Sequence, residues 1–583
     1  MSTKEVVKRL MHYVKPYGAL LVGAMVCAVI YVVMSLLSPV LIGQAVDGII
    51  GPGQVDFAGI GRIALYLVFV LAAGGLFQWL MTLCTNKVCY RTVKDLRTEV
   101  FSRIIHVPLK FIDQNAHGNI INRIVNDVDS VSDGLLQGFT QLFTGVITIL
   151  GTLGFMISIN PWIALVVVAL TPVSLVIATL IARGTHTTFL KQNRIQGELS
   201  GHVEEMLSGQ KLVKLFGHEK ASEEKLEEIN QRLYVWGYKA QIYPAFTNPL
   251  TRFVNGLVYA AVGVAGALAA VRGVLTIGQL SCFLSYANQY TKPFNEVTGI
   301  MAQLQTAMAA ARRLMALIDE PVEEEASPLQ HLPQGNTPIA FEDVSFHYLP
   351  DRPLIEHFHL EVQPGQRIAI VGPTGCGKTT LINLLMRFYD VVDGAITLGG
   401  VDIRTVSRDE LRSRFGMVLQ ETWLTQATVA ENIGYGKPGA TREEIIAAAK
   451  AAHADSFVRR LPQGYDTVIS ENGGNLSQGQ KQLLCIARVM LMDPPMLILD
   501  EATSNIDTMT ELRVQKAFAA MVKGRTSFVV AHRLSTIKEA DRILVMNQGH
   551  VVETGTHETL LAQNGFYAKL YRSQFEAQEH AIA

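Results

Sequence analysis

Apolar residues dominate the first three hundred positions of this 583-residue chain and become sparser afterwards. A run of about 18 or more apolar residues is long enough to cross the ~30 Å hydrocarbon layer of a membrane as a helix. The pattern predicts six such spans, at about 18–46, 58–84, 136–159, 162–184, 246–271 and 276–300. We therefore expect an α-helical transmembrane domain over residues 1–318.

Two long polar stretches between the spans, roughly 85–135 and 185–245, keep helical periodicity and contain little Gly or Pro. At 1.5 Å per residue, twenty helical residues reach about 30 Å beyond the bilayer. The pattern predicts that the spans continue as long cytoplasmic extensions. Candidate turns lie at 114–119 and 217–221.

Basic residues cluster before the first span, between spans two and three, and between spans four and five. Short connections such as 47–58 are nearly free of Lys and Arg. Because basic loops stay in the cytoplasm, we expect a multi-pass protein of a bacterial inner or plasma membrane with both termini cytoplasmic. Residues 1–17 are basic and amphipathic. They are interpreted as a helix lying on the inner membrane face rather than as a cleaved targeting peptide.

Three ionisable residues fall inside the last two spans: Arg252, Lys292 and Glu296. Ionisable residues within a membrane are often functional, so contact with substrate is one interpretation. All three are near the inner leaflet, however, where long basic side chains reach the interface without any such role. Both interpretations stay open.

Residues 319–337 turn acidic and contain Pro, as linkers do, and residues 338–575 have the pattern of a soluble α/β domain. Strands are predicted at 339–348 and 366–371, and a helix from about Lys378 to Phe388. The net charge of −1 lacks the basic surplus of a nucleic-acid-binding protein. Six cysteines without C-x-x-C spacing indicate neither a zinc site nor a disulfide framework.

Residues 372–379 match the phosphate-loop pattern G-x-x-x-x-G-K-[ST] between a predicted strand and a helix. Backbone N–H groups from Gly375 to Thr380 are expected to bind nucleotide phosphates, with Lys378 across the β- and γ-phosphates. The Thr379 hydroxyl is a candidate Mg²⁺ ligand. The predicted phosphate-binding residues are Gly372, Pro373, Thr374, Gly375, Cys376, Gly377, Lys378, Thr379 and Thr380.

A second set of candidates follows the apolar strand 496–499. Asp500, expected at the end of a buried strand beside the phosphate loop, would hold Mg²⁺ through water. Glu501 comes next and is suited to orienting or polarising an attacking water. A solvated strand end is the alternative for this acidic pair, but an upstream phosphate loop argues against it.

Leu476-Ser477-Gln478-Gly479-Gln480 lies just before that strand, and with it the whole chain resembles the ATP-binding cassette exporters. The resemblance implies a six-span membrane domain fused to a P-loop ATPase domain with a helical subdomain. It implies ATP and Mg²⁺ as cofactors. It also implies that Tyr348 stacks on adenine, Gln420 senses the γ-phosphate and Mg²⁺, and His532 contacts the γ-phosphate.

In this family Ser477, Gly479 and Gln480 would bind ATP held by another subunit, so the single cassette implies that two chains work together. Gln478 and Asn505-Ile506 depart from the common Gly and Ala-Leu. These departures resemble the hydrolytically intact half of heterodimeric exporters. The other half would then have a degenerate Walker B motif without a counterpart of Glu501. A homodimer is the alternative.

The resemblance implies an ATPase with Lys378, Glu501 and His532 as its catalytic residues. It would export amphiphilic small molecules, of multidrug or lipid type, by alternating access, and the turns at 114–119 and 217–221 would couple the two domains. The alternatives are a homodimeric lipid flippase, a peptide exporter, and an ATP-gated channel or regulator without net pumping. A catalytically idle scaffold half is disfavoured by the intact Glu501 and His532. The expected partners are a second half-transporter, the lipid membrane and the substrate, with no nucleic acid.

Overall fold

A computed structural model describes residues 1–51, 54–323, 325, 329–419, 422–470, 473–500, 508–531 and 534–574. The chain divides into two compact units. The membrane unit consists of residues 1–106 and 115–320, and the cassette unit of residues 107–114 and 321–583. A short segment from the predicted membrane domain therefore clusters with the cassette.

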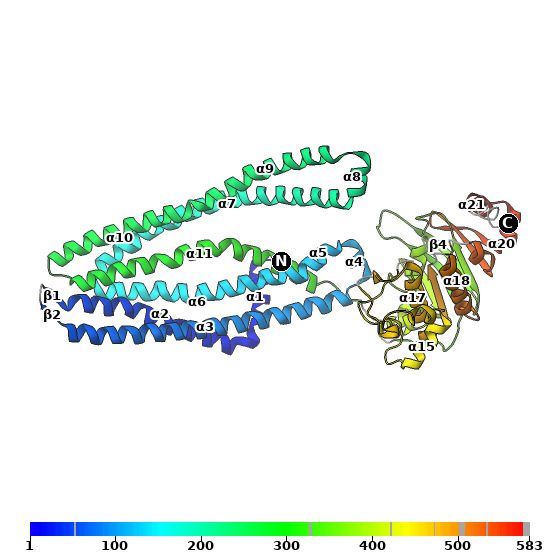
Figure 1. Cartoon of the computed structure of the whole chain (residues 1–583), viewed down its shortest axis with the longest axis horizontal. Coiled ribbons are helices and arrows are strands. Elements are labelled where there is room, and N and C mark those ends of the chain that lie inside the picture. The colour runs from blue at the N-terminus through cyan, green and yellow to red at the C-terminus, as the bar shows by residue number, and fades with distance from the viewer. Residues whose placement is uncertain are drawn as a thin grey trace. The chain divides into compact units, whose positions relative to one another are not determined.

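Long helices make up the membrane unit (Figure 1). They are α1 (Thr3–Val14), α2 (Gly18–Asp47), α3 (Phe57–His106), α5 (His117–Asn122), α6 (Val128–Ile159), α7 (Pro161–Ser208), α8 (Gln210–Phe216), α9 (Glu219–Ala245), α10 (Thr247–Val271) and α11 (Ile277–Ile318). A small hairpin, β1 (Ile49–Gly51) with β2 (Gln54–Val55), follows α2. Among the described residues, four of the six predicted spans lie in helices long and apolar enough to cross a membrane. The spans predicted at 162–184 and 276–300 lie within α7 and α11 and stay predictions.

Two helices continue far beyond the length of a span, as the polar periodicity predicts. With 50 residues in α3 and 48 in α7, these helices are about 75 and 72 Å long. The second predicted turn is confirmed, because Gly217 adopts a left-handed conformation, φ 65°, between α8 and α9. Figure 1 shows α7 and α9 side by side, ending at α8.

The first predicted turn begins earlier than the sequence pattern indicated. The helix α3 ends at His106, and a separate helix, α4 (Leu109–Gln114), precedes the turn at 115–116. Pro108 accounts for the break, because a proline disfavours helical geometry in the residue before it and cannot donate a backbone N–H. The segment 107–114 is the part of the chain that clusters with the cassette unit.

A π-helical segment, Arg123–Asp127, interrupts the path from α5 to α6. The Asp127 side chain is only 4 % exposed and receives two hydrogen bonds from Arg313 of α11, the one from Nε at 2.8 Å. π-Helical turns are uncommon, and a buried carboxylate is stable only when it is paired. The Asp127–Arg313 pair therefore holds this irregular turn against α11.

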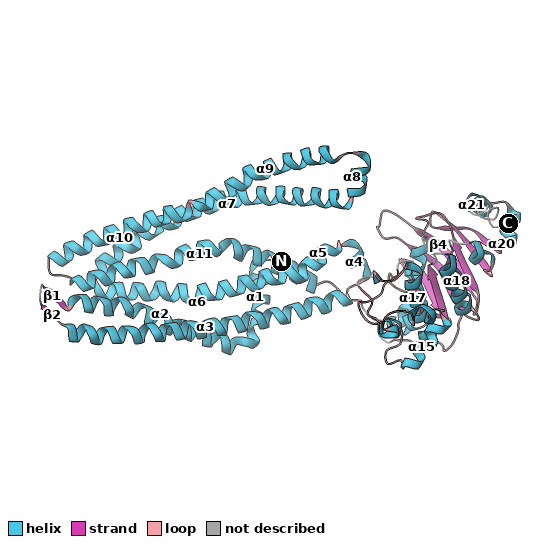
Figure 2. Cartoon of the chain, viewed as in Figure 1, coloured by secondary structure: helices cyan, strands magenta, loops and turns pink. Residues whose placement is uncertain are grey.

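The cassette unit contains two sheets, magenta in Figure 2. In spatial order the six-stranded sheet comprises β12 (His550–Gly555), β11 (Arg542–Asn547), β5 (Arg367–Val371), β10 (Thr526–Val530), β9 (Met496–Asp500) and β8 (Phe415–Val418). Only β12 runs antiparallel to its neighbour in this sheet. The antiparallel four-stranded sheet comprises β4 (Ile355–Val362), β3 (Ile339–Phe346), β6 (Asp393–Leu398) and β7 (Val401–Asp402).

The helices of the cassette unit complete the predicted α/β domain. Besides α4, they are α12 (Lys378–Leu385), α13 (Arg408–Ser413), α14 (Val429–Gly434), α15 (Arg442–Ala451), α16 (Asp455–Val458), α17 (Gln478–Met492), α18 (Thr508–Val522), α19 (Leu534–Lys538), α20 (His557–Gln563) and α21 (Phe566–Gln574). The helix predicted at 378–388 ends at Leu385, three residues early.

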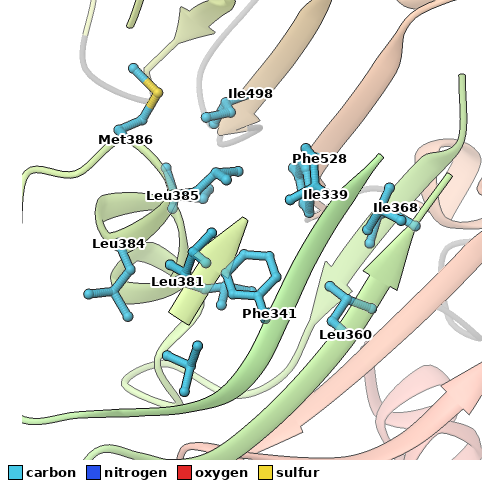
Figure 3. Close-up of a cluster of buried hydrophobic side chains, with 14 of the residues drawn as sticks. Ile339, Phe341, Leu360, Ile368, Leu381, Leu384, Leu385, Met386, Ile498 and Phe528 are labelled. Carbon is cyan, nitrogen blue, oxygen red and sulfur yellow. The ribbon is translucent and has the colours of Figure 1, made fainter. Parts of the chain in front are cut away.

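Apolar side chains bury both faces of the central parallel strands. In β9, Met496 and Ile498 join a core shared with α12 and the antiparallel sheet, part of which Figure 3 shows. The alternate residues Leu497 and Leu499 join a second core with α14, α15 and α17, the helical subdomain. One strand therefore anchors both halves of the cassette.

Removing the charge of Asp127 should destabilise the membrane unit. Asp127→Asn would leave the Arg313 guanidinium without its buried counter-charge, and we expect a loss of about 1–2 kcal/mol because Arg313 itself is half exposed. The matched control is Asp129→Asn, which breaks an exposed pair with Arg97 and should change stability by no more than about 0.5 kcal/mol. Thermal unfolding in detergent measures both. Equal shifts in the two variants would contradict the assignment.

Candidate nucleotide site

The phosphate loop leaves the sheet at the carboxyl end of β5 and is held there by the neighbouring strand β11. A Cβ atom at Gly372 would lie 2.2 Å from the Met546 carbonyl oxygen, so only glycine fits at the start of the loop. Gly549, in the turn after β11, donates its N–H to the Cys376 carbonyl at 3.1 Å. The loop is therefore fixed by backbone contacts at both its first residue and its middle.

The loop ends at the N-terminus of α12. Gly377 caps this helix with a positive φ of 101° and without a side-chain hydrogen bond. The first N–H groups of α12 therefore have no side-chain acceptor at the cap and remain suited to anions, which the helix dipole favours. Lys378 Nζ donates to the carbonyls of Gly372 and Pro373 at 2.8 and 2.9 Å, so its charge lies over the loop.

The predicted adenine-stacking residue lies beside this helix. Tyr348 donates its hydroxyl to Thr380 Oγ1 at 3.3 Å, and the residue as a whole is 38 % exposed. Phe346 and Tyr389 both approach the Tyr348 ring edge to face, with centroids 4.9 and 5.0 Å away. The structure thus places Tyr348 beside the first turn of α12, directly after the phosphate loop.

Tyr389 connects these rings to α4. Its hydroxyl donates a hydrogen bond to the Asp113 carboxylate. Burial and the contact with Asp113 raise the pKa of Tyr389 above its ordinary value, so the phenol stays protonated and acts as a donor. Asp113 of α4 is therefore linked through Tyr389 to Tyr348, the predicted adenine-stacking residue.

Asp500 ends its strand at the same edge of the sheet from which the phosphate loop leaves, but its strand β9 is not the direct neighbour of β5. The strand β10 lies between β5 and β9, and Val530 pairs with both Ile370 and Asp500. Two strand spacings put the Cα atoms of Ile370 and Asp500 about 10 Å apart. The order of these strands could not be predicted, because alternation along a chain predicts strands but not their spatial order. The position of Asp500 relative to the loop stays a prediction.

The signature segment forms the N-terminus of α17 in the helical subdomain. Ser477 and Gln480 make a reciprocal capping box: Ser477 Oγ accepts from Gln480 N, and Gln480 Oε1 accepts from Ser477 N at 2.9 Å. Gly479 is buried within the first turn. In the described part of the chain, no hydrogen bond or ion pair joins Ser477 or Gln480 to the phosphate loop.

Gln478, which departs from the family pattern, is exposed beside this cap. Its Nε2 donates to Thr422 Oγ1 at 3.2 Å. Thr422 follows two residues after Gln420, the predicted γ-phosphate sensor. A glycine at 478 could not make this link.

Several predicted residues lie outside the part of the chain that the structure describes: Gln420, Glu501, Asn505, Ile506 and His532. The strands before Glu501 and His532, β9 and β10, are neighbours and parallel. The positions of these side chains stay predictions.

Sequence reasoning missed three residues of the site. Tyr389 and Asp113 are far apart in sequence and belong to no motif, so only the fold brings them together. Gly549 carried a signal, the Gln-Gly turn after a strand, but nothing in the sequence connects that turn to the phosphate loop.

The ionisable residues of the last spans are distributed over α10 and α11. Lys292 Nζ lies 3.9 Å from Glu296, one helical turn on, and the Lys292 side chain is largely exposed. Arg252 is exposed on α10. Both earlier interpretations of these charges stay open.

Comparisons with known proteins agree with this architecture. Residues 21–294 match the ABC transporter transmembrane region, and residues 355–504 match the ABC transporter cassette family. A protein of Mycobacterium bovis named fatty acid ABC transporter ATP-binding/permease protein is 44% identical over 524 residues, which are 90% of this chain and 83% of the relative.

Other relatives match along nearly their whole length. An ATP-dependent lipid A-core flippase of Desulfotalea psychrophila is 34% identical over 98% of this chain and 100% of the flippase. A solved structure of a bacterial Atm1-family ABC exporter with ATP bound covers 98% of both chains, with a TM-score of 0.77 and 28% identity. The chain under study therefore belongs to the ABC transporter family, as an exporter-type half-transporter whose cassette couples ATP hydrolysis to transport.

Proposed function

We propose that this exporter moves amphiphiles with long acyl chains, and that it works as one half of a dimer. The observation that carries the proposal is a phosphate loop with the Tyr348 ring beside it, in the same polypeptide as a membrane unit. Two relatives support the substrate class, since one is named for fatty acids and the other for lipid A-core, and both substrates carry acyl chains. The protein would be multi-pass with both termini in the cytoplasm of a bacterial cell.

ATP would bind with adenine on Tyr348 and its phosphates on the backbone N–H groups of α12. Lys378 would exchange its two carbonyl acceptors for β- and γ-phosphate oxygens. The exposed Thr379 hydroxyl and the Asp500 carboxylate fit Mg²⁺, which would neutralise charge on the phosphates. Asp500 would hold the ion through water.

Hydrolysis would use residues at the same edge of the sheet. Glu501 would accept a proton from the attacking water. The oxygen of that water would bond to the γ-phosphorus while the bond from phosphorus to the β,γ-bridging oxygen breaks, leaving ADP. Gln420 and His532 would contact the γ-phosphate. Their support is the motif order and the position of their strands, β8, β9 and β10, beside one another.

The second chain would complete the site. Ser477, Gly479 and Gln480, at the N-terminus of α17, would bind the γ-phosphate of ATP held by the partner, where the helix dipole favours an anion. Gln478 and Asn505-Ile506 support a partner with a degenerate Walker B motif, which makes this chain the hydrolytically competent half. ATP would close the two cassettes, and the helices that extend beyond the bilayer would pass that movement to the spans.

Glu501→Gln should separate binding from chemistry. We expect ATP affinity to stay near the parent value and turnover to fall by about 100-fold or more, since general-base catalysis contributes that much. Lys378→Ala should instead weaken ATP binding itself. The matched control is Glu443→Gln, an exposed carboxylate on α15, which should leave both unchanged. Nucleotide-binding assays measure the affinity and phosphate release measures the turnover. Brisk hydrolysis by Glu501→Gln would contradict the assignment of Glu501 as the general base.

Transport should require ATP and an acyl chain. In inverted vesicles that contain this chain and its partner, a labelled long-chain fatty acid should accumulate against its gradient with ATP. A water-soluble peptide should not accumulate. An ATP-dependent conductance without uphill accumulation would favour a gated channel and contradict the proposal.

Purification of this chain alone tests the pairing. A heterodimer predicts little ATPase activity until the second half-transporter is added. Robust activity from a self-paired complex would contradict the heterodimer and leave a homodimeric exporter, with the substrate proposal intact.

Tyr389 should support ATP binding through its ring and act on α4 through its hydroxyl. Tyr389→Ala removes one of the two rings that hold Tyr348, so ATP should bind about three- to tenfold more weakly. Tyr389→Phe keeps the ring and loses the bond to Asp113. It should retain ATP affinity within about twofold, while substrate stimulates its ATPase less. Equal ATP affinity in both variants would refute the role of the ring.

A further inference from the structure

The N-terminal helix α1 divides into faces with different surroundings. Val6, Leu10 and Val14 recur at every fourth residue and are buried. Arg9 and Tyr13 lie beside them on the next stripe of the helix. The helix is therefore attached to the rest of the membrane unit along one side only.

The stripe of Arg9 and Tyr13 is fully occupied by partners from other helices. Arg9 pairs with Asp319, at the end of α11, at 2.5 Å. Tyr13 donates to Glu99 of α3 at 2.8 Å. Directly after α1, Tyr17 donates to Asp95 of α3 at 2.6 Å. These bonds fix the rotation of α1 about its own axis, and thus decide which residues face outward.

The outward face is mainly basic, and the one acidic residue of α1, Glu5, lies three residues before Lys8. Lys8, His12 and Lys15 are exposed at positions i, i+4 and i+7, and none of them has an ion pair within the described residues. They line a shallow hollow with Met11 and Leu21. A hollow lined by both basic and apolar side chains is complementary to a molecule that has an anionic head and an apolar tail.

We propose that this hollow binds the headgroup of an anionic phospholipid in the leaflet next to α1. Lys8 and Lys15 would contact the phosphate, with His12 as a further donor. Met11 and Leu21 would lie against the first part of the acyl chains. The proposal rests on the placement of α1 at the membrane surface.

The position of α1 in the chain supports a membrane lipid as the occupant. The apolar helix α2 begins at Gly18, three residues after Lys15, so these lysines lie next to the start of a span. Val7 and Met11 are 42% and 37% exposed and lie between the buried stripe and the basic one. This order of buried, apolar and basic stripes around the helix is typical of helices that lie in a membrane interface. Lysines near an anionic membrane surface each contribute about 1 kcal/mol of attraction.

The test uses the full-length protein in nanodiscs with a tryptophan reporter in the hollow. Met11→Trp should be quenched more strongly by phosphatidylglycerol with brominated acyl chains than by brominated phosphatidylcholine, after subtraction of the parent protein's quenching. From the quenching, the preference for the anionic lipid should fall on the order of fivefold for each lysine removed in Lys8→Gln and Lys15→Gln. Raising the salt concentration should also lower the preference, because ions screen exposed charges.

The control removes two exposed lysines from the cassette, Lys523→Gln with Lys569→Gln, and should keep the full preference. Equal quenching by the two lipids would overturn the proposal. So would a preference that survives the loss of Lys8 and Lys15. A brominated free fatty acid that displaces the phospholipid and quenches more strongly would also overturn it, and would assign the hollow to an acyl substrate instead. The comparison of the two phospholipids and of the lysine variants is independent of whether the protein transports fatty acids.

Discussion

In hydrocarbon every backbone N–H and C=O must find a partner inside the protein, because an unpaired group costs several kcal/mol. In the membrane unit this constraint is visible where a proline interrupts the hydrogen bonds of a helix. Pro39, inside α2, cannot donate a backbone N–H to the preceding turn. Side chains of α11 donate to two carbonyls near this proline: Tyr286 to Leu36 O at 2.6 Å and Cys282 to Pro39 O at 2.8 Å. The stretch of α2 around Pro39 is therefore attached to α11 by specific hydrogen bonds.

Asp47 extends the same attachment to the end of the pair. Its carboxylate accepts from Gly278 N at 2.8 Å and from the Thr276 hydroxyl at 2.7 Å, at the N-terminus of α11. The helices approach closely there, since a Cβ at Gly278 would lie 2.0 Å from Gly43 O. Helices α2 and α11 are therefore joined at three levels by hydrogen bonds between a side chain of one helix and the backbone of the other.

The sequence predicts those parts of the molecule that depend on local spacing. The length of an apolar run predicts α2 within a residue, and glycine spacing predicts the phosphate loop between β5 and α12. Spatial order is not local, so the insertion of β10 between the two motif strands could not be predicted. The helix α4 was missed because its own residues read as ordinary amphipathic helix, and only Pro108 marks the break. Asp113 and Tyr389 meet through the tertiary fold alone.

The two phosphate-binding candidates are both helix N-termini, yet they are capped in opposite ways. Gly377 contributes no side chain to the cap of α12, so the donors of that first turn are left for a ligand. Ser477 does cap α17, and its Oγ accepts a hydrogen bond from Gln480 N. A hydroxyl can accept and donate at the same time, so the Ser477 proton stays available while the acceptor bond fixes the direction of the oxygen. The capping box therefore occupies the N–H groups of Ser477 and Gln480, but it leaves the Ser477 hydroxyl proton available and orients that hydroxyl. Alanine at 477 would lose the cap and the donor together, whereas threonine would keep both, so the two substitutions differ in their effect even though both remove the serine.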